Sequence, residues 1–187
     1  PLAGMQPGPS QAGDGTMIPA YLTLPPGKET AKGLPAIVLP HGGPEARDEW
    51  GFDWMVQYYA ARGFAVLQPQ FRGSAGFGEA WLMRNGYRSW RMAISDVVDA
   101  GRWLVAQGIA NPDKLTIAGW SYGGYAALQA QAVDPALFKA VVAIAPVTDF
   151  ADRMRRSQYS ADYLLQQQRM GTGPEAAEAS PSNHAAA

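Results

Sequence analysis

Residues 114–132 read Lys-Leu-Thr-Ile-Ala-Gly-Trp-Ser-Tyr-Gly-Gly-Tyr-Ala-Ala-Leu-Gln-Ala-Gln-Ala. The apolar run Leu115–Ala118 predicts a buried strand, and the alanine-rich run after residue 122 predicts a helix. Between them, residues 119–123 form the pattern G-x-S-x-G. A strand, a sharp turn and a helix in this order are typical of a nucleophile elbow. Ser121 is therefore the candidate nucleophile.

The glycines on either side of the serine have a steric reason. At such an elbow the backbone turns so tightly that side chains at positions 119 and 123 would collide. A helix that starts at Tyr122 would direct its first N–H groups, and the positive end of its dipole, at the place where an anionic tetrahedral intermediate forms. The same five-residue pattern also occurs by chance in loops with two glycines. The flanking strand and helix favour the elbow.

The composition is that of an ordinary globular protein. A chain of 187 residues with 47% apolar residues is long enough for one domain with a buried core. The net charge of -1 gives no electrostatic surface for nucleic acid or for an anionic membrane. No apolar run approaches the length that spans a bilayer. We expect neither nucleic acid nor a membrane as a partner.

Cysteine and histidine are scarce. The absence of cysteine excludes a disulfide, a thiolate metal site and a cysteine nucleophile, and it is compatible with a reducing compartment such as the cytoplasm without establishing one. His41 and His184 are the two histidines of the sequence, so a histidine-rich metal site is excluded as well. We expect no cofactor and no metal.

The N-terminal part of the chain has a weaker pattern. Residues Pro1–Gly15 are rich in proline, glycine and small polar residues, and we interpret them as a linker or the end of a preceding domain. The chain starts without methionine or a signal-peptide pattern, so we expect it to be a piece of something longer. Thr16–Leu24 predicts a first strand, which Pro19 would confine to a sheet edge or a bulge.

Strands and helices alternate through the rest of the chain. Short apolar runs predict buried strands at 36–39, 64–67, 115–118 and 140–145, with a turn at 111–113, and helices are expected at 53–62, 96–107 and after the elbow. This alternation predicts an α/β fold with a mainly parallel sheet and helices on both faces.

The loop Pro40–Pro44 follows a predicted strand and would lie where the carboxyl ends of parallel strands build sites. In hydrolases with this elbow, the second N–H donor to the oxyanion comes from such a loop. We assign that donor to Gly43 and the other to the N–H of Tyr122. Gly42 and His41 are expected to shape the loop. We prefer this role for His41 over direct catalysis because a triad histidine follows the nucleophile in these folds.

Two further segments allow more than one interpretation. The glycine-rich residues 71–78 fit neither G-x-G-x-x-G nor a P-loop, which favours a tight connection over a phosphate site. From Phe150 onward, arginines, tyrosines and the run Gln166–Gln168 predict polar helices over the mouth of the site. A cap that contacts substrate and a solvated connector both stay open.

Five segments of the chain, taken together and in this order, form a recognisable set: 18–22, 41–44, 71–78, 119–124 and 180–185. They resemble the motifs of the prolyl oligopeptidase family of serine peptidases, in particular its acylaminoacyl-peptidase and dipeptidyl-peptidase branches. The resemblance covers nearly the whole chain from about Asp14. It implies an α/β-hydrolase catalytic domain that acts on peptides and that follows a β-propeller in the parent protein.

The same resemblance implies a fold that is incomplete at its C-terminus. In the family, the triad aspartate and histidine lie on two βα units after the segment that matches Ser180–Ala185, where this chain stops. We therefore expect this chain alone to be inactive. Asp149 and His184 are the alternative partners, because His184 is the one histidine downstream of Ser121.

These observations predict a partial peptidase domain at residues 16–187, which hydrolyses short peptides through an acyl-enzyme on Ser121. A carboxylester hydrolase is the alternative within enzymes, since the same elbow cleaves esters. A fragment or scaffold without turnover is the alternative outside them. Substrate preference and the existence of a homo-oligomer do not follow from the sequence.

Overall fold

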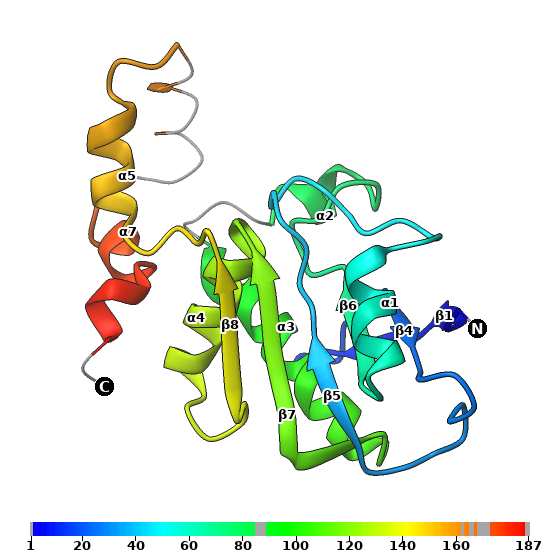
Figure 1. Ribbon diagram of the computed structural model, residues 1–187. Helices are drawn as coiled ribbons and strands as arrows, with labels where there is room; N and C mark the ends of the chain where they lie inside the picture. Colours follow the sequence, from blue (N-terminus) through cyan, green and yellow to red (C-terminus); the bar gives the residue numbers. More distant parts are fainter. Residues whose placement is uncertain (1, 85–88, 162, 165–166, 168–172, 186–187) are drawn as a thin grey trace.

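The main feature of the structure, a computed structural model, is one mixed β-sheet (Figure 1). The structure describes residues 2–84, 89–161, 163–164, 167 and 173–185. Within them, six strands form the sheet in the order β1-β4-β6-β5-β7-β8. The strands are β1 Met5–Pro7, β4 Ala20–Thr23, β6 Ala65–Pro69, β5 Leu34–Val38, β7 Ala110–Trp120 and β8 Ala140–Ile144.

The remaining elements of the described residues are two short strands and the helices. Strands β2 Ser10–Gln11 and β3 Met17–Ile18 pair with each other outside the main sheet. The helices are α1 Trp54–Ala61, α2 Glu79–Leu82, α3 Trp90–Ala106, α4 Tyr122–Val133, α5 Phe150–Ser157 and α7 Pro174–Glu178, followed by the 3₁₀ helix η2 Pro181–His184.

The predicted mainly parallel sheet is confirmed. Strands β6, β5, β7 and β8 are parallel neighbours, whereas β1 and β4 run antiparallel at one side. Because the four parallel strands end at the same edge of the sheet, the loops that follow them gather there, at the top in Figure 1.

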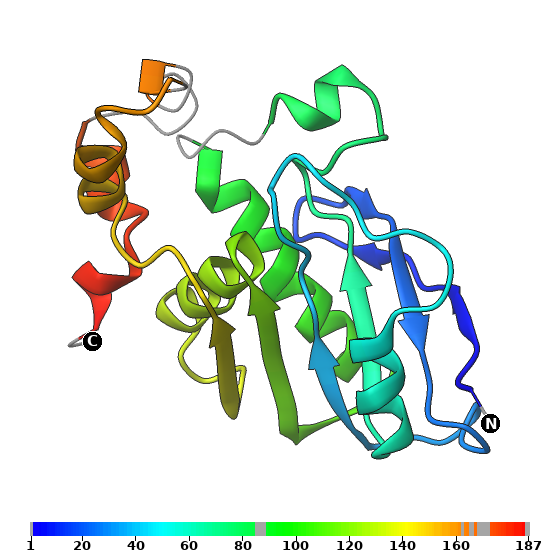
Figure 2. The ribbon, with the colours of Figure 1, turned by 45° about the horizontal axis from the view of Figure 1, so that its top comes forward.

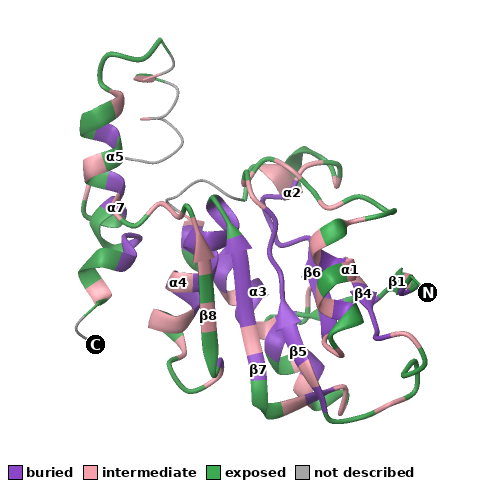
Figure 3. Ribbon diagram, viewed as in Figure 1, coloured by how far each residue is buried: buried purple, intermediate pink, exposed green. Residues whose placement is uncertain are grey.

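Helices cover both faces, as expected. Figure 2 shows α1 on one side of the sheet and α3 and α4 on the other. Under α1 lies a small core with Ile37, Val56 and Val66, and the larger core lies under α3 and α4. All five residues of β6, including the polar Gln68, are buried (Figure 3), as expected for a strand between two helical layers.

The helix ends follow the chemistry of the sequence. The carboxylate of Asp53 accepts hydrogen bonds from the N–H groups of Met55 and Val56, at 2.8 and 3.0 Å, and so caps α1. Gly63, with φ of 92°, ends the same helix. Helix α3 begins at Trp90, before the predicted Asp96, because Trp90 and Ile94 extend its buried face.

Three expectations near the strands are corrected. Residues 1–15, which lack periodicity, carry β1 and β2, because backbone hydrogen bonds with β4 and β3 need no side-chain pattern. Pro19 interrupts the first predicted strand, but β4 lies inside the sheet between β1 and β6. The expected turn at 111–113 belongs to β7, and a register shift near Leu34 accommodates it.

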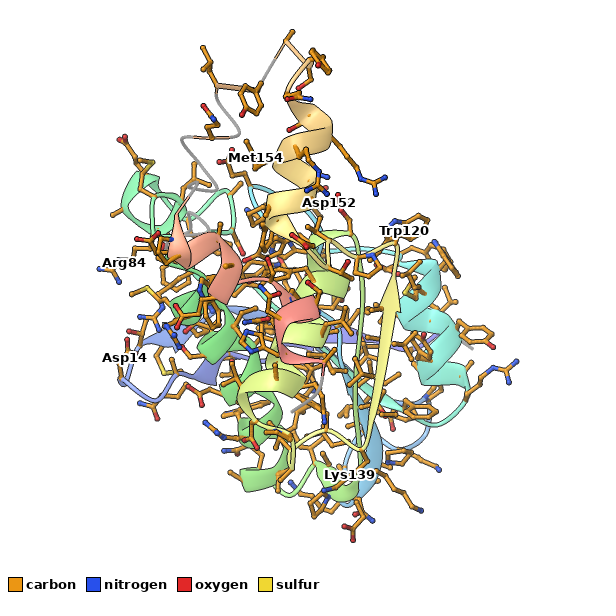
Figure 4. The ribbon with its side chains drawn as sticks, turned by 90° about the vertical axis from the view of Figure 1, so that its left-hand side faces the viewer. Asp14, Arg84, Trp120, Lys139, Asp152 and Met154 are labelled. Atoms are coloured by element: carbon orange, nitrogen blue, oxygen red, sulfur yellow. The ribbon has the colours of Figure 1, made fainter. Side chains whose placement is uncertain are left out.

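Strand β8 forms one edge of the described sheet. It pairs with β7 from Ala140 to Ile144, and its side chains are half-buried or exposed. Figure 4 views the molecule from this side, with β8 as the nearest strand of the sheet. The segment that leaves β8 continues into α5, whose N-terminus is capped by Asp149.

Candidate active site

Ser121 lies between β7 and α4 in an unusual backbone conformation. Its φ of 54° and ψ of -117° fall in a region that residues with a side chain rarely adopt. The N–H of Ser121 donates to the carbonyl of Ile144 at 2.9 Å, so the neighbouring strand holds the turn. Ser121 is exposed at the sheet edge where the parallel strands end. This is the geometry of an elbow that presents a hydroxyl to solvent.

The two flanking glycines are required by close packing. A Cβ atom on Gly119 would lie 2.3 Å from the carbonyl carbon of Gly123, and one on Gly123 would lie 2.1 Å from the carbonyl oxygen of Pro40. Both distances are far below van der Waals contact. The absence of a side chain therefore lets the elbow close on itself and lets the 40–44 loop approach it.

The 40–44 loop lies directly beside the serine. A Cβ atom on Gly42 would be 3.7 Å from the Cβ of Ser121 and 3.3 Å from the carbonyl oxygen of Trp120. Gly43 has a φ of 127°, which favours glycine, and a side chain there would crowd Ala46. The structure thus brings Gly42 and Gly43 to the same edge as Ser121 and Tyr122.

His41 holds this loop through both ring nitrogens. Its Nδ1 lies 2.7 Å from the carbonyl oxygen of Gly42, and its Nε2 lies 2.7 Å from the hydroxyl of Ser74. Burial lowers the pKa of His41 to about 4, so the ring is neutral at neutral pH. A carbonyl can only accept, hence Nδ1 carries the proton and Nε2 has none to donate. The Ser74 hydroxyl also lies 2.7 Å from the Phe71 carbonyl oxygen, so its single proton is shared between that oxygen and Nε2.

Aromatic rings connect the loop, the elbow and α5. The ring of His41 stacks on Phe71 at 4.4 Å, and Phe71 stacks on Tyr122 at 5.6 Å. Tyr122 contacts Tyr125 at 5.1 Å, and Tyr125 meets Phe150 edge-on at 5.0 Å. Such contacts stabilise each neighbour beyond its buried area. The side chain of Tyr122 therefore anchors the start of α4 while its N–H lies beside the serine.

The glycine-rich segment 71–78 is held from within by Arg72. The Arg72 guanidinium donates to Asp96 through Nε at 2.9 Å and Nη2 at 2.5 Å, and it also pairs with Asp14. Hydrogen bonding with Asp96 raises the pKa of Arg72 above its usual value, and Arg72 lowers that of Asp14. Removing one partner of such a buried pair typically costs about 3–5 kcal/mol. These contacts favour a fixed connection between β6 and α2, as expected from the sequence, over a phosphate site.

Asp48 ties the continuation of the 40–44 loop to β6. Its backbone exchanges hydrogen bonds with the side-chain amide of Gln70, at 3.1 and 2.9 Å, and its carboxylate accepts from Gln68 at 3.0 Å. Burial, and then the charge of Asp53, raise the pKa of Asp48 to about 7, although the hydrogen bond from Gln68 opposes both. Sequence reasoning missed these residues, because no motif links positions so far apart in the chain.

The alternative partners Asp149 and His184 do not meet Ser121. Asp149 accepts the N–H of Asp152 at 2.9 Å as the cap of α5, and the His184 Nε2 lies 2.8 Å from the carbonyl oxygen of Glu178. His184 shares a groove with Leu128 and other residues of the later turns of α4, whereas Ser121 precedes its first turn. Within the described part of the chain, no hydrogen bond joins either residue to Ser121.

The described residues contain no cluster of three histidine, cysteine, aspartate or glutamate side chains arranged to hold a metal ion. Across the same residues, no helix has the length and apolar character needed to cross a bilayer.

The sheet order, the helical layers and the elbow define the class of the protein as an α/β-hydrolase. Within that class, residues 50–187 match the prolyl oligopeptidase family. The chain belongs to this family, as its motifs indicated.

Relatives and solved structures agree with this membership. The chain is 40% identical over 146 residues to dipeptidyl aminopeptidase BIII of Pseudoxanthomonas mexicana, covering 74% of this chain and 21% of the relative. It is 27% identical over 151 residues to the acylamino-acid-releasing enzyme of Arabidopsis thaliana, covering 81% and 20%. A puromycin-hydrolyzing peptidase of Mycobacterium tuberculosis superposes with a TM-score of 0.83 at 27% identity, over 97% of this chain and 29% of that one.

The chain spans about a fifth of the length of the curated relatives it matches.

The Asp48 carboxyl predicts a specific pH dependence of stability. A carboxyl whose pKa rises from 3.8 to about 7 on folding contributes stability fully below its unfolded pKa, and this contribution is lost as the pH rises through about 7. Asp48→Asn stays neutral, so its unfolding free energy relative to the parent should be higher at pH 8 than at pH 5, by on the order of 1 kcal/mol. Chemical denaturation at both pH values measures it.

Asp113→Asn, at an exposed carboxyl, is the matched control and should show no such pH-dependent difference. An Asp48→Asn variant whose stability relative to the parent is the same at both pH values contradicts the assignment.

Proposed function

We propose that the protein is a serine peptidase in which Ser121 attacks the carbonyl of a peptide bond. The observation that carries this proposal is the backbone conformation of Ser121 at the exposed edge of the sheet, beside a glycine loop. The family supports it, and so do the names of relatives, which include a dipeptidyl aminopeptidase and an acylamino-acid-releasing enzyme. Short peptides are the substrate class that we propose.

The reaction we propose is acyl transfer. A histidine base takes the proton of the Ser121 hydroxyl while its oxygen bonds to the substrate carbonyl carbon. The resulting oxyanion accepts hydrogen bonds from the N–H groups of Tyr122 and Gly43. The amine then leaves with the proton returned by the base, and water releases the acyl group from Ser121. We place the base and its aspartate in the full-length protein outside these 187 residues, because Asp149 and His184 are engaged elsewhere.

His41 and Gly42 have a positioning role in this proposal. The carbonyl of Gly42 and the N–H of Gly43 belong to one planar trans peptide, so they point in opposite directions. When His41 Nδ1 donates to that carbonyl, it fixes the direction of the Gly43 N–H as well. A donor fixed before the reaction stabilises the oxyanion without a reorganisation cost. The Gly42 carbonyl, which can only accept, in turn fixes the His41 tautomer with the proton on Nδ1.

A carboxylester hydrolase would use the same serine and donors, and a scaffold would use neither. We favour the peptidase over both alternatives because two curated relatives are named as a dipeptidyl aminopeptidase and an acylamino-acid-releasing enzyme. Ester cleavage by the same serine would not contradict it, since the elbow supports attack on either carbonyl.

The first kinetic prediction concerns Ser121 itself. In the full-length protein, Ser121→Ala should lower kcat on a short peptide amide by about 10⁶-fold, as loss of the nucleophile does in a related triad. The 187-residue chain alone should show no peptidase activity above background, because it lacks a base in contact with the serine. Steady-state kinetics of both proteins provide the measurement.

Hydrolysis by the 187-residue chain, abolished separately by Ser121→Ala and by His184→Ala, would show that His184 is the base and would overturn this account. Unchanged turnover in full-length Ser121→Ala would remove Ser121 from the reaction altogether.

The second kinetic prediction concerns His41. Loss of one oxyanion donor costs about 10²–10³-fold in kcat, so loosening that donor in His41→Ala should lower kcat by about tenfold or more with little change in KM. His41→Gln keeps an N–H donor and should recover part of kcat. Ser74→Ala, which leaves the Nδ1 contact in place, is the matched control and should have a smaller effect. A rise in KM with kcat unchanged in His41→Ala would contradict the positioning role.

A further inference from the structure

A pocket of about 380 Å³ lies beside the elbow, between the segment that leaves β8 and helix α5. The lining includes Pro146, which is two residues beyond Ile144 in the chain. The carbonyl of Ile144 accepts a hydrogen bond from the N–H of Ser121 at 2.9 Å. Figure 1 shows that the segment leaving the upper end of β8 leads to α5, which stands beyond β8, and Figure 4 labels Asp152 on that helix. The pocket therefore begins two residues beyond the strand residue that holds Ser121, on the β8 side of the elbow. The 40–44 loop reaches Ser121 from the β5 side.

Helix α5 is anchored by one face and lines the pocket with another. Phe150 and Met154 are buried, and Phe150 packs edge-on against Tyr125 of α4 at 5.0 Å. Arg153 and Arg156 are one turn apart and line the pocket. The anchored face holds the backbone in place, so the two arginines are presented by a supported helix.

The charges of the pocket do not cancel. The Asp152 carboxylate pairs with Arg155 and Arg156, and these hydrogen bonds lower its pKa. The Asp149 carboxylate accepts a helix N–H of α5 at 2.9 Å. Residues 149–156 contain three arginines and two aspartates, so one positive charge is left over.

That charge is assigned to Arg153. Its backbone N–H donates to Asp149, but no ion pair joins its guanidinium to any residue that the structure describes. The hydroxyls of Ser157 and Ser160 donate to the carbonyls of Met154 and Ser157. Arg156 also lines the pocket, but its Nε is held by Asp152. The guanidinium of Arg153, with the hydroxyl of Thr148, therefore supplies donors for a ligand in the pocket whose charge is not offset by a carboxylate.

We propose that this pocket is a substrate subsite for a carboxylate, bound by the guanidinium of Arg153. A guanidinium matches a carboxylate with two parallel hydrogen bonds, which a neutral amide of the same shape cannot reproduce. The carboxylate belongs to an aspartate or glutamate side chain next to the scissile bond, or to the C-terminus of a short peptide. The inference deepens the proposed peptidase function and rests on it for the identity of the substrate.

The kinetic test uses the full-length protein and peptide pairs of one sequence. One pair differs by aspartate or asparagine next to the scissile bond, and the other by a C-terminal acid or amide. The parent should prefer the acid member of one pair in kcat/KM by about tenfold or more. Arg153→Gln should abolish that preference through a fall in kcat/KM for the acid member of the pair. Arg155→Gln, which alters a neighbouring arginine outside the pocket lining, should keep the preference. An equal preference in the parent and Arg153→Gln overturns the subsite.

A binding test separates this inference from the peptidase assignment. Isothermal titration of full-length Ser121→Ala with N-acetyl-aspartyl amide, N-acetyl-alanine and N-acetyl-asparaginyl amide needs no turnover. The first carries only a side-chain carboxylate, the second only a terminal one and the third none. Binding of the first or the second that Arg153→Gln weakens about tenfold supports the subsite, even if no peptide is cleaved. Equal binding of all three, or binding that Arg153→Gln leaves unchanged, overturns it.

Discussion

The backbone of Ser121 is the constraint on which the candidate site depends. A positive φ at a residue with a side chain is unfavourable, so it persists only where the surroundings determine it. The hydrogen bond to Ile144 holds it from β8, and the contacts of Gly119 and Gly123 close the turn around it. The register of β7 with β8 and the approach of the 40–44 loop are thus coupled to one residue.

The second layer of the site keeps the 40–44 loop rigid. His41 contacts both Gly42 and Ser74, so the loop after β5 and the loop after β6 are joined next to Ser121. Stacked rings carry the same connection through Phe71 to Tyr122, which begins the helix behind the serine. The hydrogen bonds of His41 and the stacked rings hold the 40–44 loop together, because His41 takes part in both. Donors to an oxyanion have to be held in place before the reaction in this way.

Local patterns predicted the α/β architecture, the helix at 53–62 and the elbow, because glycine spacing and apolar runs act over a few residues. Features set by distant contacts were not predictable. Strand β1 forms through backbone hydrogen bonds with β4, and Pro112 lies in β7 because a register shift accommodates it.

Of the site, Ser121, Tyr122 and the 40–44 loop were located from sequence, whereas Ser74 and Asp48 have no local signal. Their partners lie 33 and 20 residues away and are defined only by the folded chain.

The central claim is that one oxygen bound at Ser121 is held by two backbone N–H groups. The most direct measurement is a crystal structure of the full-length protein after reaction with a phosphonate that mimics the tetrahedral intermediate. We predict a covalent bond to the Ser121 hydroxyl oxygen and one phosphonate oxygen at about 2.7–3.1 Å from both the Tyr122 and the Gly43 nitrogen atoms. A phosphonate bound to another residue, or an adduct on Ser121 with that oxygen directed away from Gly43, would contradict the account.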